Sequence, residues 1–473
     1  MIRVLYVASG LDSKGGLASE LPKFIANSAE NVHVDVIVPH TENIDEGASR
    51  LAQRLVRCHA EIDGNTQDIA VLEGRNDAHI RTFYLDCNAL RGGLHLNDDS
   101  GVAACAIFAQ GVCDWLANAP AAYDVVHCEG VLTALVPVFM RTLKAGCAAI
   151  DRAKTVVFLA GIEAKASVAL DWIRRLGLPQ SLSTSEGLEF YGKMSLLKGA
   201  YLYADKIAFP NTCVKHRIEK NVGRDIGMEG VLFNKLDRLE TIRVGLDLNA
   251  CDPECDKALE ANFSADDLSG KSKCRNALTK SLRLAKDRPV LVFIGALNAD
   301  SGIDFVNDML DDLMDRNVNL VIVGRGNDAY EQAVESWKQE FKGRVAWLKK
   351  PLDAKEIKRL LAAADILLLP AKHESLCRLH QIAMRLGCVP VVRRQALAAN
   401  DIVRVRDVQD KISQENGFTY ENDDSDDFFN AAMDALDLID SDKWDAIRKN
   451  GMTKNPTIFD TANDCIRIYN AIH

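Results

Sequence analysis

The chain has 473 residues, of which 48% are hydrophobic and 26% are charged, a composition typical of a soluble protein with more than one hydrophobic core. Its net charge of −10 argues against a surface that binds nucleic acid or anionic lipid. The 13 cysteines are dispersed without a CxxC pair, which predicts reduced thiols in a cytoplasmic protein and no disulfide framework.

No targeting or membrane-spanning segment is predicted. The first residues, MIRVLYVASG, lead straight into a strand without a charged region before it. No continuous apolar run reaches about 18 residues, the length that a membrane-spanning helix needs. We therefore expect no membrane partner.

The first half of the sequence has the pattern of a parallel α/β domain. A strand over 2–8, a glycine-containing loop, a helix over 17–27 and a strand over 32–39 form a βαβ opening. The later elements predicted from apolar periodicity are strands over 79–85, 125–127, 155–159 and 206–209, and helices over 102–117 and 189–203. We expect this domain to span residues 1–247.

A second series of the same kind follows a polar, helical linker over 248–288. The elements predicted in it are strands over 289–297, 319–326, 344–348 and 366–369, and helices over 303–315, 328–341 and 354–363. We expect a second Rossmann-like domain over 289–445 and terminal helices over 446–473 that cross back to the first domain. This order predicts two doubly wound α/β domains facing a central cleft.

The stretch from 364 to 394 is the most suggestive for function. An apolar strand ends at Pro370, a short polar loop carries Glu374, and a helical pattern follows. Open α/β sheets bind ligands beyond the carboxyl ends of their strands, beside helix N-termini. Two interpretations of Glu374 stay open: a carboxylate that caps the helix, or one that accepts hydrogen bonds from sugar hydroxyls.

Three other loops at predicted strand ends carry glycines. Gly15 and Gly16 lie in the first βα turn, where a plain tight turn and a ligand loop are equally good interpretations. Gly295 and Gly324 follow two strands of the second domain, and Arg325 beside Gly324 is either a phosphate contact or a solvated side chain. The two histidines of HESLCRLH are seven residues apart, so no metal site is predicted there.

Several segments resemble the bacterial glycogen and plant starch synthases. SKGGLASELPKFIA (13–26) is similar to the family's KTGGL…LPKAL segment, and DVVHCEGVLTALVPVFM (124–140) to DVVHAHDWHTALVPVYL. EGLEFYGKMSLLKGAYLYADKI (186–207) resembles the stretch before the family's VSPTYA motif, and residues 244–278 resemble its NGIDYDIWNPETDP…YSADDLEGKAKNKAAL linker. FIGALNADSGIDFV (293–306) and LLLPAKHESLCRLHQIAMRLGCVPVVRR (367–394) are similar to FIGRLTxQKGxDLV and LLxPSRFEPCGLxQLxAMRYGxxPVVRR.

This resemblance implies the GT-B fold and a glucosyltransferase. Such an enzyme transfers glucose from ADP-glucose, with retention, to an α-1,4-glucan, and it needs no cofactor and no metal. The resemblance assigns the catalytic-site carboxylate to Glu374. It implies a donor-binding set that consists of Gly15, Gly16, Gly295, Gly324, Leu376, Cys377 and Arg378.

The departures from the family pattern fall on polar residues. The family lysine of KTGGL corresponds to Ser13, the aspartate of HDW to Gly130, and a histidine beside the reacting sugar to Ala160. The arginine and lysine that clamp the nucleotide diphosphate correspond to Ala296 and Ser301.

Two hypotheses about function follow from these departures. In the first, the protein is a glucosyltransferase whose phosphate clamp is rebuilt from Lys14, Lys372 and Arg378. In the second, it is a catalytically inactive paralogue that binds α-glucan, a nucleotide sugar or an active glycogen synthase. Preorganised charge is commonly the largest catalytic contribution. Both hypotheses stay open: they differ in whether other cations replace the two that are lost, and an assay of nucleotide-sugar turnover separates them.

Overall fold

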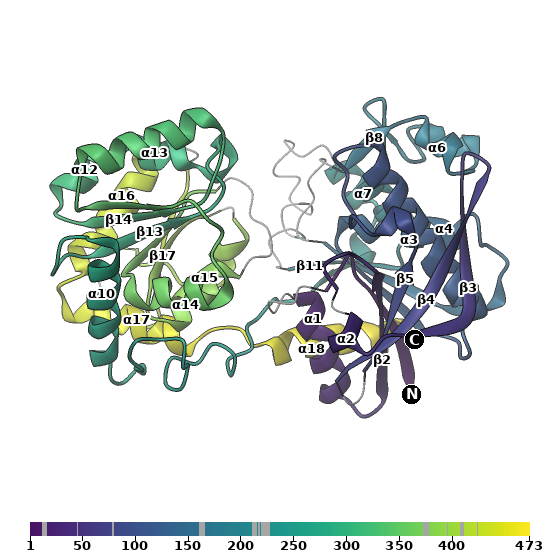
Figure 1. Ribbon diagram of the computed structural model, residues 1–473, viewed down its shortest axis with the longest axis horizontal. Helices are drawn as coiled ribbons and strands as arrows, with labels where there is room; N and C mark the ends of the chain where they lie inside the picture. Colours follow the sequence, from purple (N-terminus) through teal and green to yellow (C-terminus); the bar gives the residue numbers. More distant parts are fainter. Residues whose placement is uncertain are drawn as a thin grey trace. The chain divides into compact units, whose positions relative to one another are not determined.

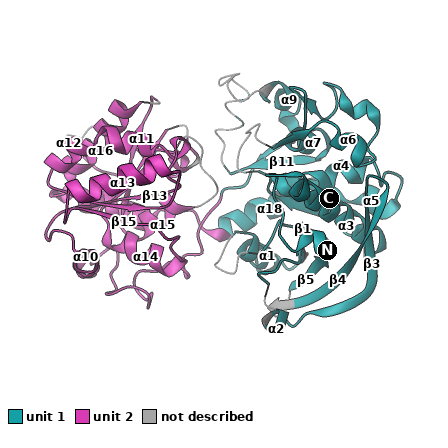
Figure 2. Ribbon diagram, turned by 45° about the horizontal axis from the view of Figure 1, so that its top comes forward, with its two compact units in different colours: residues 1–243, 459–473 teal, residues 244–458 magenta. Residues whose placement is uncertain are grey.

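The computed structural model divides the chain into two compact units (Figure 1, Figure 2). Unit 1 comprises Met1–Arg243 with Phe459–His473, and unit 2 comprises Val244–Ile458. The described residues are 1–11, 17–44, 46–77, 80–159, 166–210, 215, 218, 228–371, 378–394, 396–406, 411–422 and 424–473. Residues 248–288, predicted to be a linker, are counted within unit 2.

Unit 1 is built on a nine-stranded sheet with the order β12-β11-β7-β6-β1-β2-β5-β4-β3. Its seven parallel strands are β1 (Ile2–Val7), β2 (Val32–Pro39), β5 (Ile80–Asp86), β6 (Val125–Glu129), β7 (Lys154–Phe158), β11 (Lys206–Phe209) and β12 (Leu239–Thr241). Each of the first six lies close to a strand predicted from its apolar run, because strands buried on both faces are nearly continuous in apolar residues.

A long antiparallel hairpin at one edge of this sheet was not predicted. It consists of β3 (Ala52–Ile62) and β4 (Asn65–Asp77), and β4 pairs antiparallel with β5. Most of β3 is exposed, and only Cys58 and Ala60 are buried on it. Its sequence therefore lacks the apolar run that revealed the central strands.

The helices of unit 1 cover both faces of the sheet (Figure 1). They are α1 (Leu17–Ser28), α2 (Glu46–Ser49), α3 (Asp99–Asn118), α4 (Leu135–Arg141), α5 (Ala148–Arg152), α6 (Trp172–Arg175), α7 (Leu196–Tyr203), α9 (Glu229–Phe233) and α18 (Ile458–Ile472). Among the described helices, α3 alone is long and apolar enough to span a membrane, and 78% of its apolar window is buried within unit 1. Because it is mostly buried, α3 is a core helix of unit 1.

The helix predicted over 189–203 is wrong in its first half. A small sheet with the order β8-β10-β9 forms there, from β8 (Ser167–Ala169), β9 (Glu189–Phe190) and β10 (Lys193–Ser195). The helix α7 begins only after Ser195, whose side chain accepts a hydrogen bond from the backbone N–H of Lys198. A serine N-cap favours a helix start at this point.

Unit 2 contains a six-stranded parallel sheet with the order β15-β14-β13-β16-β17-β18. Its strands are β13 (Val290–Ile294), β14 (Asn319–Val323), β15 (Val345–Leu348), β16 (Ile366–Leu369), β17 (Val389–Arg393) and β18 (Phe418–Tyr420). Its helices are α10 (Ser269–Leu282), α11 (Ile303–Asp308), α12 (Leu310–Asp315), α13 (Asp328–Glu340), α14 (Ala354–Ala363), α15 (Leu379–Arg385), α16 (Ser425–Leu438) and α17 (Asp442–Thr453). In the predicted linker only α10 is helical, and turns make up most of the rest.

A buried charged cluster lies at the amino ends of the unit 2 strands. Asp365, directly before β16, accepts hydrogen bonds from Arg275, Arg448 and the backbone N–H of Val290. Asp365 is fully buried, and these hydrogen bonds offset the cost of removing its carboxylate from water. The cluster therefore joins α10, α17 and the central strands.

Lys271 of α10 lies beside this cluster and is 2% exposed. Its ammonium group donates to the carbonyl oxygens of Leu361 (3.3 Å), Ala362 (3.0 Å) and Leu386 (2.9 Å). These carbonyls lie at the ends of α14 and α15, where helices leave acceptors without internal partners. Burial, and then the charge of Arg448, lower the pKa of Lys271 to about 7.

Candidate functional site at the carboxyl ends of the strands

Glu129 lies at the carboxyl end of β6 and presents a carboxylate at that edge of the unit 1 sheet. The hydroxyl of Tyr6 donates to its Oε2 atom. Tyr6 is buried, and burial, followed by the charge of Glu129, raises the pKa of its phenol well above the usual value. The phenol therefore stays protonated and acts as a donor that fixes Glu129.

A buried polar chain continues beneath Tyr6. The ring of His127 stacks on that of Tyr6, with centroids 4.6 Å apart, and its Nδ1 atom lies 2.7 Å from the hydroxyl of Tyr469 in α18. Burial lowers the pKa of His127 to about 3, so the imidazole is neutral near pH 7. His127 thus connects the last helix to the residue that holds Glu129.

Gly130 follows Glu129 in a conformation that favours glycine strongly. Its φ of 80° and ψ of 166° lie in a region that is almost restricted to this residue. Its N–H donates to the carbonyl oxygen of Phe158 (2.9 Å). An aspartate at this position would be strained in this backbone, although a Cβ would meet open space.

In unit 2, Gly324 allows two strand ends to approach each other closely. Its φ is 146°, and a Cβ built on it would lie 1.8 Å from the carbonyl oxygen of Gly295. The neighbouring loops are held by hydrogen bonds from Gly295 N–H to Val323 (3.0 Å) and from the Trp347 indole to Gly324 (3.0 Å). Gly324 is therefore required for backbone packing, and its proposed contact with a donor is an additional hypothesis.

Replacing Gly324 by alanine should lower the free energy of unfolding by roughly 3 kcal/mol, because the new methyl group meets backbone in an unfavourable conformation. Thermal unfolding of the two variants Gly324→Ala and Gly295→Ala measures this effect. The matched Gly295→Ala change should be tolerated, since its Cβ would meet the Phe293 ring at 3.4 Å and the Ser301 Cβ at 3.8 Å, both ordinary contacts with side chains. Equal melting temperatures of the two variants would contradict the packing role.

Ser301 is occupied by a local structural role. Its N–H donates to the Asn298 side chain (2.9 Å), and its hydroxyl accepts from the N–H of Asn298 (3.4 Å), which makes a capping box. The same hydroxyl donates to the carbonyl oxygen of Asn298 (2.7 Å). Ala296, two residues before Asn298, carries no polar side chain. Ala296 and Ser301 therefore supply no cation at the carboxyl ends of the unit 2 strands.

Arg378 lies directly before the first residue of α15. It is the N-cap residue, with a left-handed backbone (φ 49°), and its Nη1 donates to the carbonyl oxygen of Gly245 (3.0 Å). Arg325 is directed elsewhere: its side chain is 68% exposed and pairs with Glu331 (3.4 Å). Of these two arginines, Arg378 is the one whose position the surrounding structure fixes through a side-chain bond to backbone.

Asp401 organises the first turn of α15, a role that no sequence pattern indicated. Its Oδ2 atom lies 2.7 Å from Nε2 of His380 and accepts from Gln381 (2.7 Å), which also donates to the carbonyl oxygen of Val244 (2.6 Å). Neither this aspartate nor Tyr6 belongs to a recognisable motif. The signal for Tyr6 was a single hydroxyl in an apolar strand.

The remaining candidate residues lie outside the described residues: Ser13, Lys14, Gly15, Gly16, Ala160, Lys372, Glu374, Leu376 and Cys377. Among the described residues, no group of three or more His, Cys, Asp or Glu side chains is arranged to hold a metal ion. The eleven described cysteines are all free.

Comparison with known proteins covers both units. Residues 3–232 match the model of the starch synthase catalytic domain, and residues 288–437 match that of glycosyl transferases group 1. The chain is 28% identical to a glycogen synthase of Geotalea uraniireducens over 96% of this chain and 95% of that protein. It is 31% identical to glycogen synthase 2 of Geobacter sulfurreducens over 74% of this chain and 72% of the relative. The chain belongs to the glycogen and starch synthase family.

The fold of the chain agrees with that family. The catalytic domain of starch synthase IV from Arabidopsis thaliana, solved with ADP and acarbose, superposes with a TM-score of 0.87 at 20% identity, covering 100% of this chain and 99% of that one. A sucrose-phosphate synthase from Thermosynechococcus elongatus superposes with a TM-score of 0.62 at 14% identity, over 100% and 99% of the two chains. The two units are thus the Rossmann-like domains of a GT-B glycosyltransferase.

Within this glycogen and starch synthase family, the chain differs where polar side chains are expected. The structure gives a local reason for two of these differences: Gly130 has a backbone that disfavours aspartate, and Ser301 closes a capping box. Glu129 provides a carboxylate one position before Gly130, and Tyr6 holds it. The described positions Gly130, Ala296 and Ser301 thus carry no charged side chain.

Proposed function

We propose that the protein transfers glucose from a nucleotide sugar of the ADP-glucose type to an α-1,4-glucan with retention of configuration. The observation that carries this proposal is the similarity to glycogen synthases over 96% of the chain, which includes both Rossmann-like units. A cytoplasmic location belongs to the same proposal and agrees with the free described cysteines.

The proposed reaction replaces one bond at the anomeric carbon of glucose. The bond from this carbon to the nucleotide diphosphate breaks, and a bond to a hydroxyl oxygen of the glucan forms. The proton of that hydroxyl passes to the departing diphosphate. Negative charge develops on the departing diphosphate, and cations placed around it lower the barrier. Because Ala296 and Ser301 supply none, we assign this role to Lys14, Lys372 and Arg378, and we assign the contact with the donor sugar to Glu374.

A second candidate function rests on the replaced charges. Ala296, Ser301 and Gly130 remove side chains that the family uses for the donor and the acceptor, while the apolar framework is kept. A protein that retains the fold for binding has this pattern. In that case it binds α-glucan, a nucleotide sugar or an active glycogen synthase without turnover.

Transfer of labelled glucose to glycogen separates the two candidates. The purified protein is incubated with ADP-glucose or UDP-glucose and glycogen, and the product is digested to establish an α-1,4 linkage. We expect label in glycogen with ADP-glucose as donor. If no label is transferred with either donor, while ADP or glycogen still raises the melting temperature, the binding-only function replaces the proposed one.

A further inference from the structure

Tyr191 is unusual among the described residues in two independent ways. Its side chain is 85% exposed, the highest value among the described aromatic residues, and its backbone has a φ of 49°. No other large exposed hydrophobic residue in the described chain has a positive φ. A left-handed backbone is disfavoured for residues with a Cβ, and it is a clear outlier for a bulky side chain.

The turn itself does not require a tyrosine. Tyr191 and Gly192, with φ values of 49° and 76°, form the two-residue connection between β9 and β10. Two-residue hairpin turns with two positive φ values favour Asn-Gly or Asp-Gly. Tyr191 therefore occupies a turn position that favours asparagine or aspartate, and its backbone is strained. Backbone strain of this kind is concentrated at functional positions.

The hairpin holds the ring in a fixed place. Gly192 N–H donates to the Glu189 side chain (2.6 Å), and the ring of Phe190 contacts that of Tyr191 edge to face, with centroids 4.7 Å apart. The ammonium group of Lys198, a side chain that is almost completely buried, donates to the backbone carbonyls of Glu189 (2.7 Å) and Ser185. Binding to a side chain that is already ordered costs little conformational entropy.

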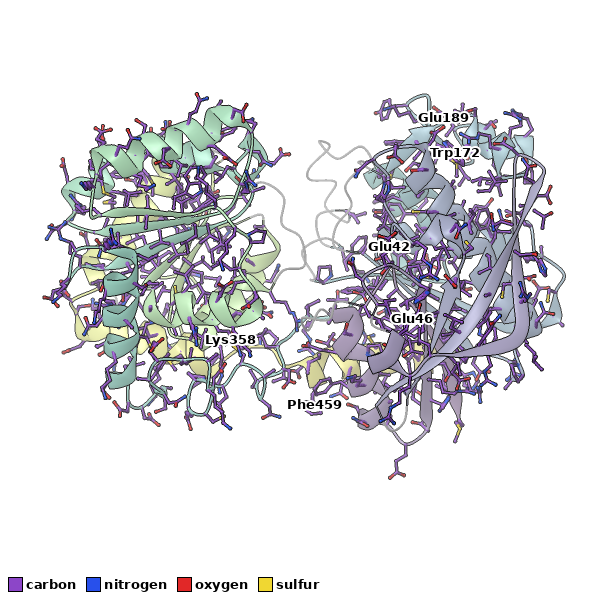
Figure 3. The ribbon with its side chains drawn as sticks, in the orientation of Figure 1. Glu42, Glu46, Trp172, Glu189, Lys358 and Phe459 are labelled. Carbon is purple, nitrogen blue, oxygen red and sulfur yellow. The ribbon has the colours of Figure 1, made fainter. Side chains whose placement is uncertain are left out.

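The hairpin also has a defined position in unit 1. Its strand β10 pairs with β8, where Ser195 is opposite Ser167 and Lys193 is opposite Ala169. Figure 3 shows Glu189 at the same end of unit 1 as Trp172 of α6. The tip lies beyond Ala169, so the length of β8 separates it from Ser167 by roughly 10 Å at 3.4 Å per residue.

This position relates the tip to the proposed reaction. Glu129 lies at the carboxyl end of a strand in the nine-stranded sheet, whereas the tip belongs to the separate three-stranded sheet β8-β10-β9. The tip is therefore expected to lie some distance along the sugar chain from the reacting end. A ring with an exposed face and a hydroxyl at its edge suits a sugar, which presents an apolar face of C–H groups and a rim of hydroxyls.

We propose that the Tyr191 ring is a stacking platform for the α-glucan, contacting glucose residues away from the end that is extended. This inference rests on the proposed function, since it names a further contact for the same acceptor. It makes Tyr191 a binding residue for long acceptors. Short acceptors end before they reach it.

The test compares Tyr191→Asn with Tyr191→Trp. Asparagine suits the turn and removes the ring, so the variant should fold at least as stably as the original protein, and its melting temperature checks this. We expect the KM for glycogen to rise about tenfold, equivalent to about 1.4 kcal/mol, while kcat and the KM for maltotriose stay within twofold. Tyr191→Trp should keep the KM for glycogen within about twofold. An unchanged KM for glycogen in the asparagine variant overturns the inference while leaving the proposed function intact.

Gel retardation in glycogen-containing gels gives a readout that does not need turnover. The unmodified protein should be retarded, and Tyr191→Asn should lose most of that retardation while Tyr191→Trp keeps it. This result supports the platform even if the transfer assay shows no reaction and the proposed function fails. Equal retardation of the unmodified protein and Tyr191→Asn, or no retardation of either, overturns the platform.

Discussion

Replacing Arg378 by alanine should reduce kcat for glucosyl transfer by about 100- to 1000-fold, the factor associated with losing one well-placed group that stabilises charge in the transition state. Arg378 is the N-cap of α15, and one of its donors is used by Gly245. A guanidinium group carries five N–H donors, so this bond is compatible with a simultaneous phosphate contact. Because the diphosphate gains charge as it leaves, kcat should fall far more than the KM for the donor rises.

Arg283→Ala is a matched control for this experiment. Arg283 is also an arginine with a left-handed backbone (φ 56°), and it ends α10. Arg283→Ala should change kcat by less than threefold. It should affect backbone strain to about the same extent as Arg378→Ala, because both arginines have a left-handed backbone. If Arg378→Ala keeps more than a third of the original kcat, the clamp does not include Arg378, and Lys14 and Lys372 become the residues to replace next.

Replacing Lys271 by methionine should lower the free energy of unfolding by about 3 kcal/mol at pH 7. The change leaves three backbone carbonyls without the donor that they share, and unpaired buried polar groups are costly. Urea unfolding followed by tryptophan fluorescence measures the change. Lys280→Met, an exposed position in the last turn of the same helix, is the control and should be nearly neutral.

The pH dependence of stability gives a second measurement on Lys271. Its pKa is lowered from 10.5 to about 7 in the folded protein, so the unfolded chain binds more protons between these values. The free energy of unfolding therefore rises with pH in this interval. Between pH 7.0 and 8.5, the free energy of unfolding of the original protein should rise by about 1.5 kcal/mol more than that of Lys271→Met, at about 1.36 kcal/mol per pKa unit. Parallel pH profiles of the two proteins would show that this lysine is not neutralised by burial.

Most of the parallel strands in both sheets were predictable because burial on both faces leaves continuous apolar runs. The short strands β12 and β18 were not predicted. The strand over 366–369 and the helix over 354–363 coincide with β16 and α14, whose limits are set by Pro370 and by the Asp353 capping box. The β3–β4 hairpin escaped prediction because one of its strands is mostly exposed. The β9–β10 hairpin escaped because its two strands are too short to show a period of two.

The sequence indicated which loops follow the strands of the candidate site. It did not indicate which side chains and backbone groups contact one another there. The glycines at 295 and 324 were identified from their places after strands, but only the structure shows that Gly324 packs against Gly295. The donation from Tyr6 to Glu129 joins residues 123 positions apart. No local pattern encodes such a contact, because it depends on the order of strands in the sheet.

The last helix has a consequence for how the chain acquires its structure during synthesis. Tyr469 and Cys465 of α18 are fully buried in unit 1, yet they are translated after the whole of unit 2. Domains generally fold as units while the ribosome adds residues. The nascent unit 1 therefore lacks α18, and His127 and Tyr6 are not covered by it, until more than two hundred residues of unit 2 have been made. Unit 2, which is continuous in sequence, has all its residues first and is expected to complete its fold before unit 1 does.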